Sequence, residues 1–123
     1  MSFPEPKNLR LMGVRDPGTS QERVAVKVLK ACDIGKYAII LAAGSDERFF
    51  PSTTCCWFPD LEADAGDFIS LRTLGTRSRS VVNRTGTKTH IISWGLDAPV
   101  WGEGSFPVLI YVAAIQLPTG NRA

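Results

Sequence analysis

His90 is the only histidine of the chain, and histidine is the side chain best suited to acid–base chemistry near neutral pH. Beside a thiol and an orienting group it would form a nucleophilic site. The candidate thiols are Cys32, Cys55 and Cys56, but their spacing places none of them beside the histidine. His90 also lies in an apolar stretch, next to Ile91. We therefore predict a hydrogen-bonded structural histidine, no catalytic residue and no enzyme.

Two kinds of metal site can be weighed from the sequence. A structural zinc ion needs about four ligands, and the adjacent Cys55 and Cys56 lack the two-residue gap that lets two thiolates converge. Carboxylates that could bind calcium gather in one acidic segment: Asp60, Glu62, Asp64 and Asp67. This segment lacks EF-hand spacing, and it contains Gly66 and follows Pro59, which favours a solvated turn. We expect neither a metal nor another cofactor.

Charge is segregated along the sequence. Residues 46–67 contain six acids and one base, whereas residues 68–96 contain five bases and no acid. We expect residues 74–89 to form a long hairpin connection that projects four cations, which we predict to contact a partner: Arg77, Arg79, Arg84 and Lys88. Such a basic loop can bind phosphate or an acidic protein surface. The alternative is a solvated loop that balances the acidic segment.

The composition is that of one globular domain. Of 123 residues, 44% are hydrophobic and 21% are charged, and the formal net charge of +2 predicts no partner. The longest apolar run, residues 108–115, is too short to span a bilayer, and the first residues lack the apolar run of a signal peptide. We expect a cytoplasmic protein without membrane contact and with reduced thiols. In an oxidising compartment, Cys32 could instead pair with Cys55 or Cys56.

Three regions can be separated along the chain. Residues 1–20 are rich in proline and glycine and are expected to form an extended N-terminal arm, in which residues 9–11 could add a short edge strand. Residues 21–116 are expected to form the folded domain, and residues 117–123 a flexible tail.

Apolar residues repeat with period two in six segments rich in Val, Ile, Thr and aromatic residues. These segments are residues 24–29, 37–42, 54–58, 68–73, 89–94 and 108–113. No window keeps helical spacing over three turns. The pattern predicts an all-β sandwich.

Trp94 and Trp101 stand on either side of the connection 95–99. We expect both rings to close one end of the core, with the indole N–H reaching a loop carbonyl, and we assign Trp57 to the core as well. The alternative is an aromatic surface that stacks on a ligand.

Three motifs resemble small bacterial stand-alone proteins related to the lamin tail domain. They are CWFPD (56–60), AGDFISL (65–71) and WGLDAPVW (94–101), within a resemblance that covers about residues 21–114. It implies an immunoglobulin-like β-sandwich of seven to nine short antiparallel strands and a non-catalytic interaction domain. The family has Asn after the second tryptophan and then Gly-Asp, where this chain has Gly102 and Gly104-Ser105, so the cap of this loop must differ.

Together these features predict a protein-interaction or structural module whose basic loop contacts an anionic partner. The expected partner is another protein with an acidic surface, or a second copy of the chain. Nucleic acid is the alternative, disfavoured because the tryptophans that could stack on bases are assigned to the core. A second hypothesis is a self-assembling component of an oligomer, fibre or shell that uses its edge strands. A hydrolase is the third.

Overall fold

The structure is a computed structural model that describes residues 4–45 and 48–119, with side chains described outside 45–53. Residues 1–3 of the expected arm, residues 120–123 of the expected tail, and Asp46 and Glu47 of the acidic stretch lie outside the described residues. Within the described residues the chain is all-β: it has ten strands, one short 3₁₀ helix and no α-helix.

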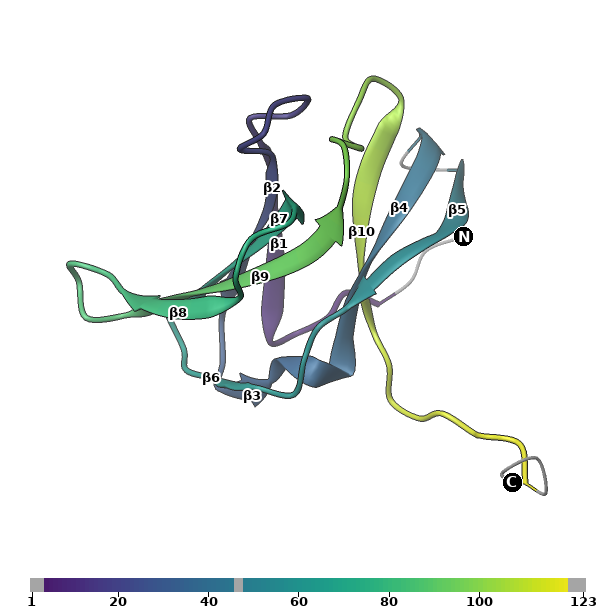
Figure 1. Cartoon of the computed structure of the whole chain (residues 1–123). Coiled ribbons are helices and arrows are strands. Elements are labelled where there is room, and N and C mark those ends of the chain that lie inside the picture. Colours follow the sequence, from purple (N-terminus) through teal and green to yellow (C-terminus); the bar gives the residue numbers. More distant parts are fainter. Residues whose placement is uncertain (1–3, 46–47, 120–123) are drawn as a thin grey trace.

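The strands form three sheets (Figure 1). The largest sheet has the order β1 (Leu9–Arg15), β2 (Arg23–Val28), β7 (Phe68–Leu74), β9 (Lys88–Leu96) and β8 (Arg79–Val82). A three-stranded sheet has the order β10 (Ser105–Tyr111), β4 (Tyr37–Ser45) and β5 (Arg48–Trp57). At one end, β3 (Cys32–Asp33) pairs with β6 (Glu62–Ala63), and the 3₁₀ helix η1 (Ile34–Lys36) leads into β4.

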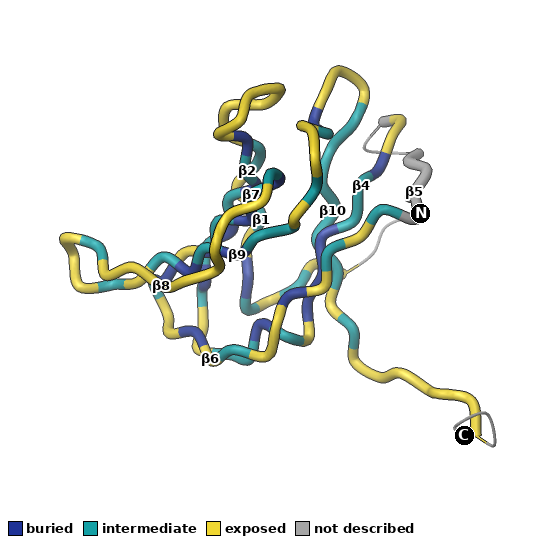
Figure 2. The backbone as a smooth tube through the Cα atoms, viewed as in Figure 1, coloured by how far each residue is buried: buried dark blue, intermediate teal, exposed yellow. Residues whose placement is uncertain are grey.

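One core lies between the two larger sheets. Alternate residues of β2 are fully buried because a strand points every second side chain to the same face. Buried residues of both larger sheets and of the loops join in a single cluster: Leu9, Val24, Val26, Val28, Ile34, Tyr37, Ile39, Phe58, Ala63, Ile69, Leu71, Ile92 and Trp101. Figure 2 shows these buried stretches facing inward, while the hairpin of β8 and β9 and the C-terminal segment are exposed.

The direction of β9 corrects two expectations. We expected only antiparallel strands, and a hairpin connection over residues 74–89, but β9 runs parallel to β7 and lies between β7 and β8. The reason is that residues 79–82 form an additional strand on the far side of β9. The chain is held there because the Thr76 N–H donates to Ser93 Oγ (3.1 Å) and the Ser93 N–H donates to Ser78 Oγ (3.0 Å).

Part of the expected N-terminal arm belongs to the folded domain. The edge strand expected over residues 9–11 is present and continues to Arg15, paired antiparallel with β2. Just before it, the carbonyl of Asn8 accepts the N–H of Leu29 at 2.7 Å. The tail after β10 is extended and exposed as far as residue 119.

Glu22 fixes the end of the core that lies near the tryptophans. Its side chain is fully buried, and its carboxylate accepts the backbone N–H groups of Gly18 (2.8 Å), Val100 (3.0 Å) and Trp101 (3.2 Å). Burial alone would raise the pKa of Glu22, but these backbone hydrogen bonds outweigh it and leave the pKa below its ordinary value. A buried carboxylate thus ties the β1–β2 turn to the loop before β10.

The three tryptophans differ in burial. Trp101 is buried and Trp94 is half-buried, with ring centroids 6.0 Å apart, as expected for core residues at this bend. The expected hydrogen bond is wrong for Trp101, whose buried Nε1 has no partner. Trp57, assigned to the core, is instead half exposed, and its indole N–H donates to the carbonyl of Gly35.

Candidate anion-binding face

The outward face of the five-stranded sheet gathers cations. On each strand the residues between the buried ones point outward, and six of them are basic: Arg10, Arg15, Arg23, Lys27, Arg72 and Arg79. The five strands contain no Asp or Glu at any position. We call these six residues, with the sheet surface between them, the basic face.

The register places like charges directly opposite one another. Arg10 lies opposite Lys27 across the β1–β2 pair, Arg15 lies opposite Arg23, and Arg23 in turn lies opposite Arg72 of β7. Like charges at directly opposed positions destabilise a sheet. Three such contacts on one face therefore oppose folding, and an anionic ligand would relieve the repulsion.

Few partners within the chain neutralise these cations. Arg23 donates to Asp16 Oδ2 at 2.8 Å, an ion pair at the surface, where such pairs stabilise little. Arg72 donates through one terminal nitrogen to the neutral Gln21 side chain at 2.8 Å, and its buried Nε has no partner. Most of the positive charge of this face thus stays available to a ligand.

An aromatic ring lies among the cations. Phe68, the first residue of β7, faces outward and is 38% exposed. Lys27 is directly opposite, with Nζ 6.0 Å from the ring centroid. This distance is at the limit of a cation–π contact. An exposed ring beside cations can contact a ligand that carries both negative charge and a planar aromatic group.

The four cations predicted from the sequence all lie on the exposed hairpin of β8 and β9. Arg77 precedes β8, Arg79 begins it, Arg84 lies in the turn and Lys88 begins β9. They are spread along the hairpin, and only Arg79 also belongs to the basic face. The hairpin extends beyond the body of the molecule in Figure 1, so these cations lie to one side of the sheet.

The remaining cations of the basic face were not predicted from the sequence. Arg10, Arg15, Arg23 and Lys27 lie far before the acid-free stretch, in segments of mixed charge. The available signal was that the basic residue in two of the alternating segments, Lys27 in 24–29 and Arg72 in 68–73, directly follows an apolar residue. Only the order and register of the strands show that these positions are neighbours.

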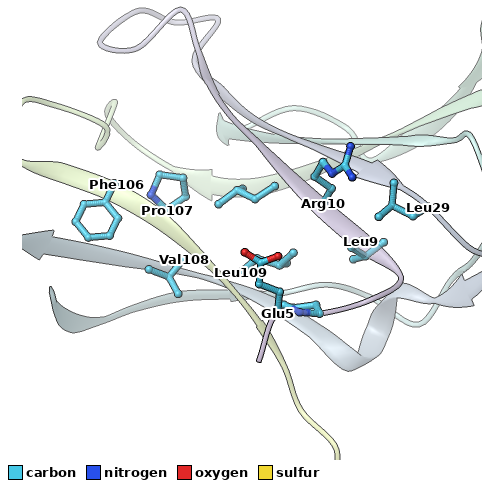
Figure 3. A pocket seen from close by; sticks show the side chains of 10 residues that line it. Glu5, Leu9, Arg10, Leu29, Phe106, Pro107, Val108 and Leu109 are labelled. Carbon is cyan, nitrogen blue, oxygen red and sulfur yellow. The ribbon is translucent and has the colours of Figure 1, made fainter. Parts of the chain in front are cut away.

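A groove lies at the open edge between β1 and β10 (Figure 3). Its volume is about 520 Å³, and its lining includes Glu5, Arg10 of the basic face, and these apolar residues: Leu9, Leu29, Phe106, Pro107 and Leu109. A second groove of about 790 Å³ adjoins it, lined by residues 4–8 and by side chains of β4 and β10. Pro107 suits this edge because proline cannot donate to a further strand.

His90 is held by a chain of hydrogen bonds. Its Nε2 is 2.9 Å from Asp67 Oδ2 and its Nδ1 is 2.7 Å from Ser80 Oγ, so both ring nitrogens have partners. Burial alone would raise the pKa of Asp67, but hydrogen bonds from the backbone of Lys88 and Asp64 and from His90 lower it overall. The composition is that of a hydrolase triad. However, His90 is only 3% exposed, and it lies directly opposite Ser80 in the β8–β9 ladder. The hydrogen bond between these two side chains therefore joins paired strands.

The other candidate groups do not converge. The three cysteines are free, and burial raises the pKa of each, that of Cys56 to about 11. The described residues contain no group of three or more His, Cys, Asp or Glu side chains placed to hold a metal ion. Asp67 is buried, unlike the solvated turn expected for the acidic segment, while Asp60, Glu62 and Asp64 are exposed.

No helix in the described part of the chain is long and apolar enough to cross a membrane. Because its cations lie opposite one another and have few partners among the described residues, the basic face is the feature that best indicates a ligand. No family model, curated protein or solved structure matches the chain.

Proposed function

We propose that this chain is a non-catalytic binding module whose basic face holds an anionic macromolecule. The observation that carries the proposal is the set of like-charge pairs Arg10–Lys27, Arg15–Arg23 and Arg23–Arg72 on strands that contain no acid. The exposed hairpin cations Arg77, Arg84 and Lys88 add positive charge beside this face without belonging to it, since Lys88 lies on the same side of β9 as His90. Positive potential over such an area steers anionic partners to the sheet.

In fold, we propose an immunoglobulin-like β-sandwich of the lamin-tail type. The two facing sheets around one core and the position of Trp101 beneath the last bend support this assignment. The parallel β7–β9 pair is a departure from the antiparallel pattern that the resemblance implies. In place of the family's Asn and Asp, Ser105 caps this loop, since its Oγ accepts the Gly102 N–H at 2.9 Å, while Glu22 accepts the N–H groups of Val100 and Trp101 just before it.

A non-catalytic role agrees with the environment of His90. A hydrolase needs a cleft in which the substrate meets its serine, and the two grooves described above are lined by neither Ser80 nor His90, whose imidazole is buried. We propose that the hydrogen bonds from Ser80 to His90 and from His90 to Asp67 hold β8, β9 and the turn before β7 together.

Retention on a heparin column tests the proposal. Replacing Arg15, Arg23 and Arg72 with Gln gives the face variant, and replacing Arg77, Arg79, Arg84 and Lys88 with Ser gives the hairpin variant. We expect the face variant to elute at clearly lower salt than the unchanged chain, because removing each cation weakens binding to a polyanion. Replacing exposed Lys7, Lys30 and Lys36 with Gln removes the same three charges as the face variant and controls for net charge. If the face variant elutes with the unchanged chain, the basic face is not the binding surface. A shift in the hairpin variant alone would assign binding to the loop.

Self-association is a second candidate, favoured by the C-terminal segment. Beyond β10 the chain stays extended, and Ile115 and Leu117 are 65% and 55% exposed. A second copy offers matching apolar surface in the groove between β1 and β10. Light scattering should then show the mass rising with concentration, and replacing Ile115 and Leu117 with Ser should keep the protein monomeric. A monomer at all concentrations would remove this candidate.

A further inference from the structure

The basic face is divided into three parallel rows by the register. One outer row is Arg15, Arg23 and Arg72, and the other is Arg10, Lys27 and Phe68. Between them on β1, β2 and β7 lies a central row of Gly13, Ala25 and Ser70, whose side chains are short. The register continues this row through Ile91 of β9 to Arg79 of β8, which closes it at that end. The face is thus a shallow trough with cations on both sides.

The central row lets a ligand approach the sheet closely. Gly13 lies at the register shift of β1 and has a positive φ of 119°, and a Cβ at this position would lie 3.5 Å from Nη1 of Arg15. The flexible Arg15 side chain must therefore move to a phosphate for a ligand to reach this part of the sheet. On β2 the outer rows are four residues apart, from Arg23 to Lys27, which is about 13 Å along a strand. Long, flexible arginine and lysine side chains on both sides can reach an extended polyanion that lies in the trough.

Phe68 distinguishes between kinds of polyanion. A ring that is partly exposed among cations can stack on the π-face of a nucleobase, whereas a sulfated sugar or a carboxylate offers no π-face to it. Duplex bases are already stacked on one another and present only their edges in the grooves, so they cannot cover this ring. Lys27 can move from the ring to a phosphate when a base takes its place.

We propose that the basic face binds single-stranded nucleic acid, with phosphates held by the two outer rows and one base stacked on Phe68. This inference rests on the proposed anion-binding function and adds the class of ligand. It needs no sequence preference, because every base has a face that can stack.

Fluorescence anisotropy with a labelled, mixed-sequence DNA single strand of about 16 nucleotides tests the inference. We expect Phe68→Leu to weaken binding of this strand about tenfold, within the range known for removal of one stacked base, and to leave heparin retention unchanged. Tyr111→Leu, at an exposed aromatic residue of the other sheet, is the matched control and should bind like the unchanged chain. In the face variant, the slope of log affinity against log salt should fall by about 0.7 for each phosphate that the protein no longer neutralises. Far-UV circular dichroism confirms that each variant is folded.

The outcomes separate this inference from the function on which it rests. Unchanged strand affinity in Phe68→Leu, or a duplex competitor that binds as tightly as the single strand, overturns the nucleic-acid assignment. Displacement of the strand by polyglutamate at lower concentration than by unlabelled strand overturns it in favour of an acidic protein. In each of these cases a heparin shift in the face variant still supports an anion-binding face. Absence of that shift overturns both proposals.

Discussion

Glu22 is the residue on which the closed end of the core depends. Three backbone N–H groups converge on its buried carboxylate, and hydrogen bonds to a charged acceptor each contribute about 1.5–3 kcal/mol. In Glu22→Gln the shape is kept but the charge is lost, and the amide NH₂ faces donors. We expect the free energy of unfolding to fall by about 2–3 kcal/mol, measured by urea denaturation with an unchanged m-value. Glu103→Gln, at an exposed loop position, is the control and should stay within about 0.5 kcal/mol.

The same buried carboxylates predict how stability depends on pH. The pKa values of Glu22 and Asp67 are lowered in the folded state, so their stabilisation is complete above the ordinary values of 4.5 and 3.8. As pH falls below about 4.5, the unfolded chain takes up protons that the folded chain resists, and stability is lost through the folded pKa values. Urea midpoints between pH 3 and 7 should fall at the acidic end, and less steeply in Glu22→Gln. Parallel curves for the two proteins would contradict this role of Glu22.

At the scale of single residues, the sequence predicts types of environment better than partners. His90 was expected to be hydrogen-bonded among apolar residues, and it is, because alternation along β9 places it on the buried face. Its partners Asp67 and Ser80 could not be predicted, since the pattern favours a solvated acidic turn for the first and a basic loop for the second. Burial of Glu22 was also missed, because two of its three hydrogen-bond donors, Val100 and Trp101, are about 80 residues away in the sequence.

At the scale of elements, the basic face implies a compromise between folding and binding. Arg72 lies opposite Arg23, and replacing it with Glu converts a like-charge contact into an opposite-charge one. We expect Arg72→Glu to raise the free energy of unfolding by about 0.2–1 kcal/mol at low salt, a gain that shrinks as salt screens the pair. The same variant should bind polyanions more weakly.

Urea denaturation at two salt concentrations, beside the heparin assay, measures both effects of Arg72→Glu. Lys30→Glu changes the net charge equally from an exposed loop and serves as the control. Arg72→Glu that is less stable than the unchanged chain at low salt would show that the cross-strand charges do not repel in the folded protein.

Strand existence and strand order differ in how far the sequence determines them. Each of the six expected segments overlaps a strand, three of them running one or two residues past its end, because β-branched, aromatic and apolar residues favour extended backbone there. Strand β8 was missed since its four residues are all exposed and carry no alternation. The parallel pairing of β7 and β9 was missed with it, and so was the basic face, which exists only once the register of β1, β2 and β7 is known.

At the scale of the whole molecule, the two ends of the chain contribute unequally to the fold. Strand β1 buries Leu9 in the shared core and forms the ladder that covers one side of β2. Residues 113–119 are all exposed, whereas Val112 still donates its N–H to the carbonyl of Lys36 at 2.8 Å. A chain that ends after Val112 should therefore keep its free energy of unfolding within about 0.5 kcal/mol.

A chain that starts after Arg15 should lose cooperative unfolding, because it leaves β2 with an unpaired edge and opens the core beside β10. Tryptophan fluorescence and far-UV circular dichroism in urea, at low protein concentration, measure both truncations. Self-association through residues 113–119 would not affect the comparison of the two truncated chains, because contacts between copies dissociate at low protein concentration. A cooperative transition at the unchanged urea midpoint without residues 1–15 would show instead that the two sheets hold their core without β1, as the expected loosely attached arm implies.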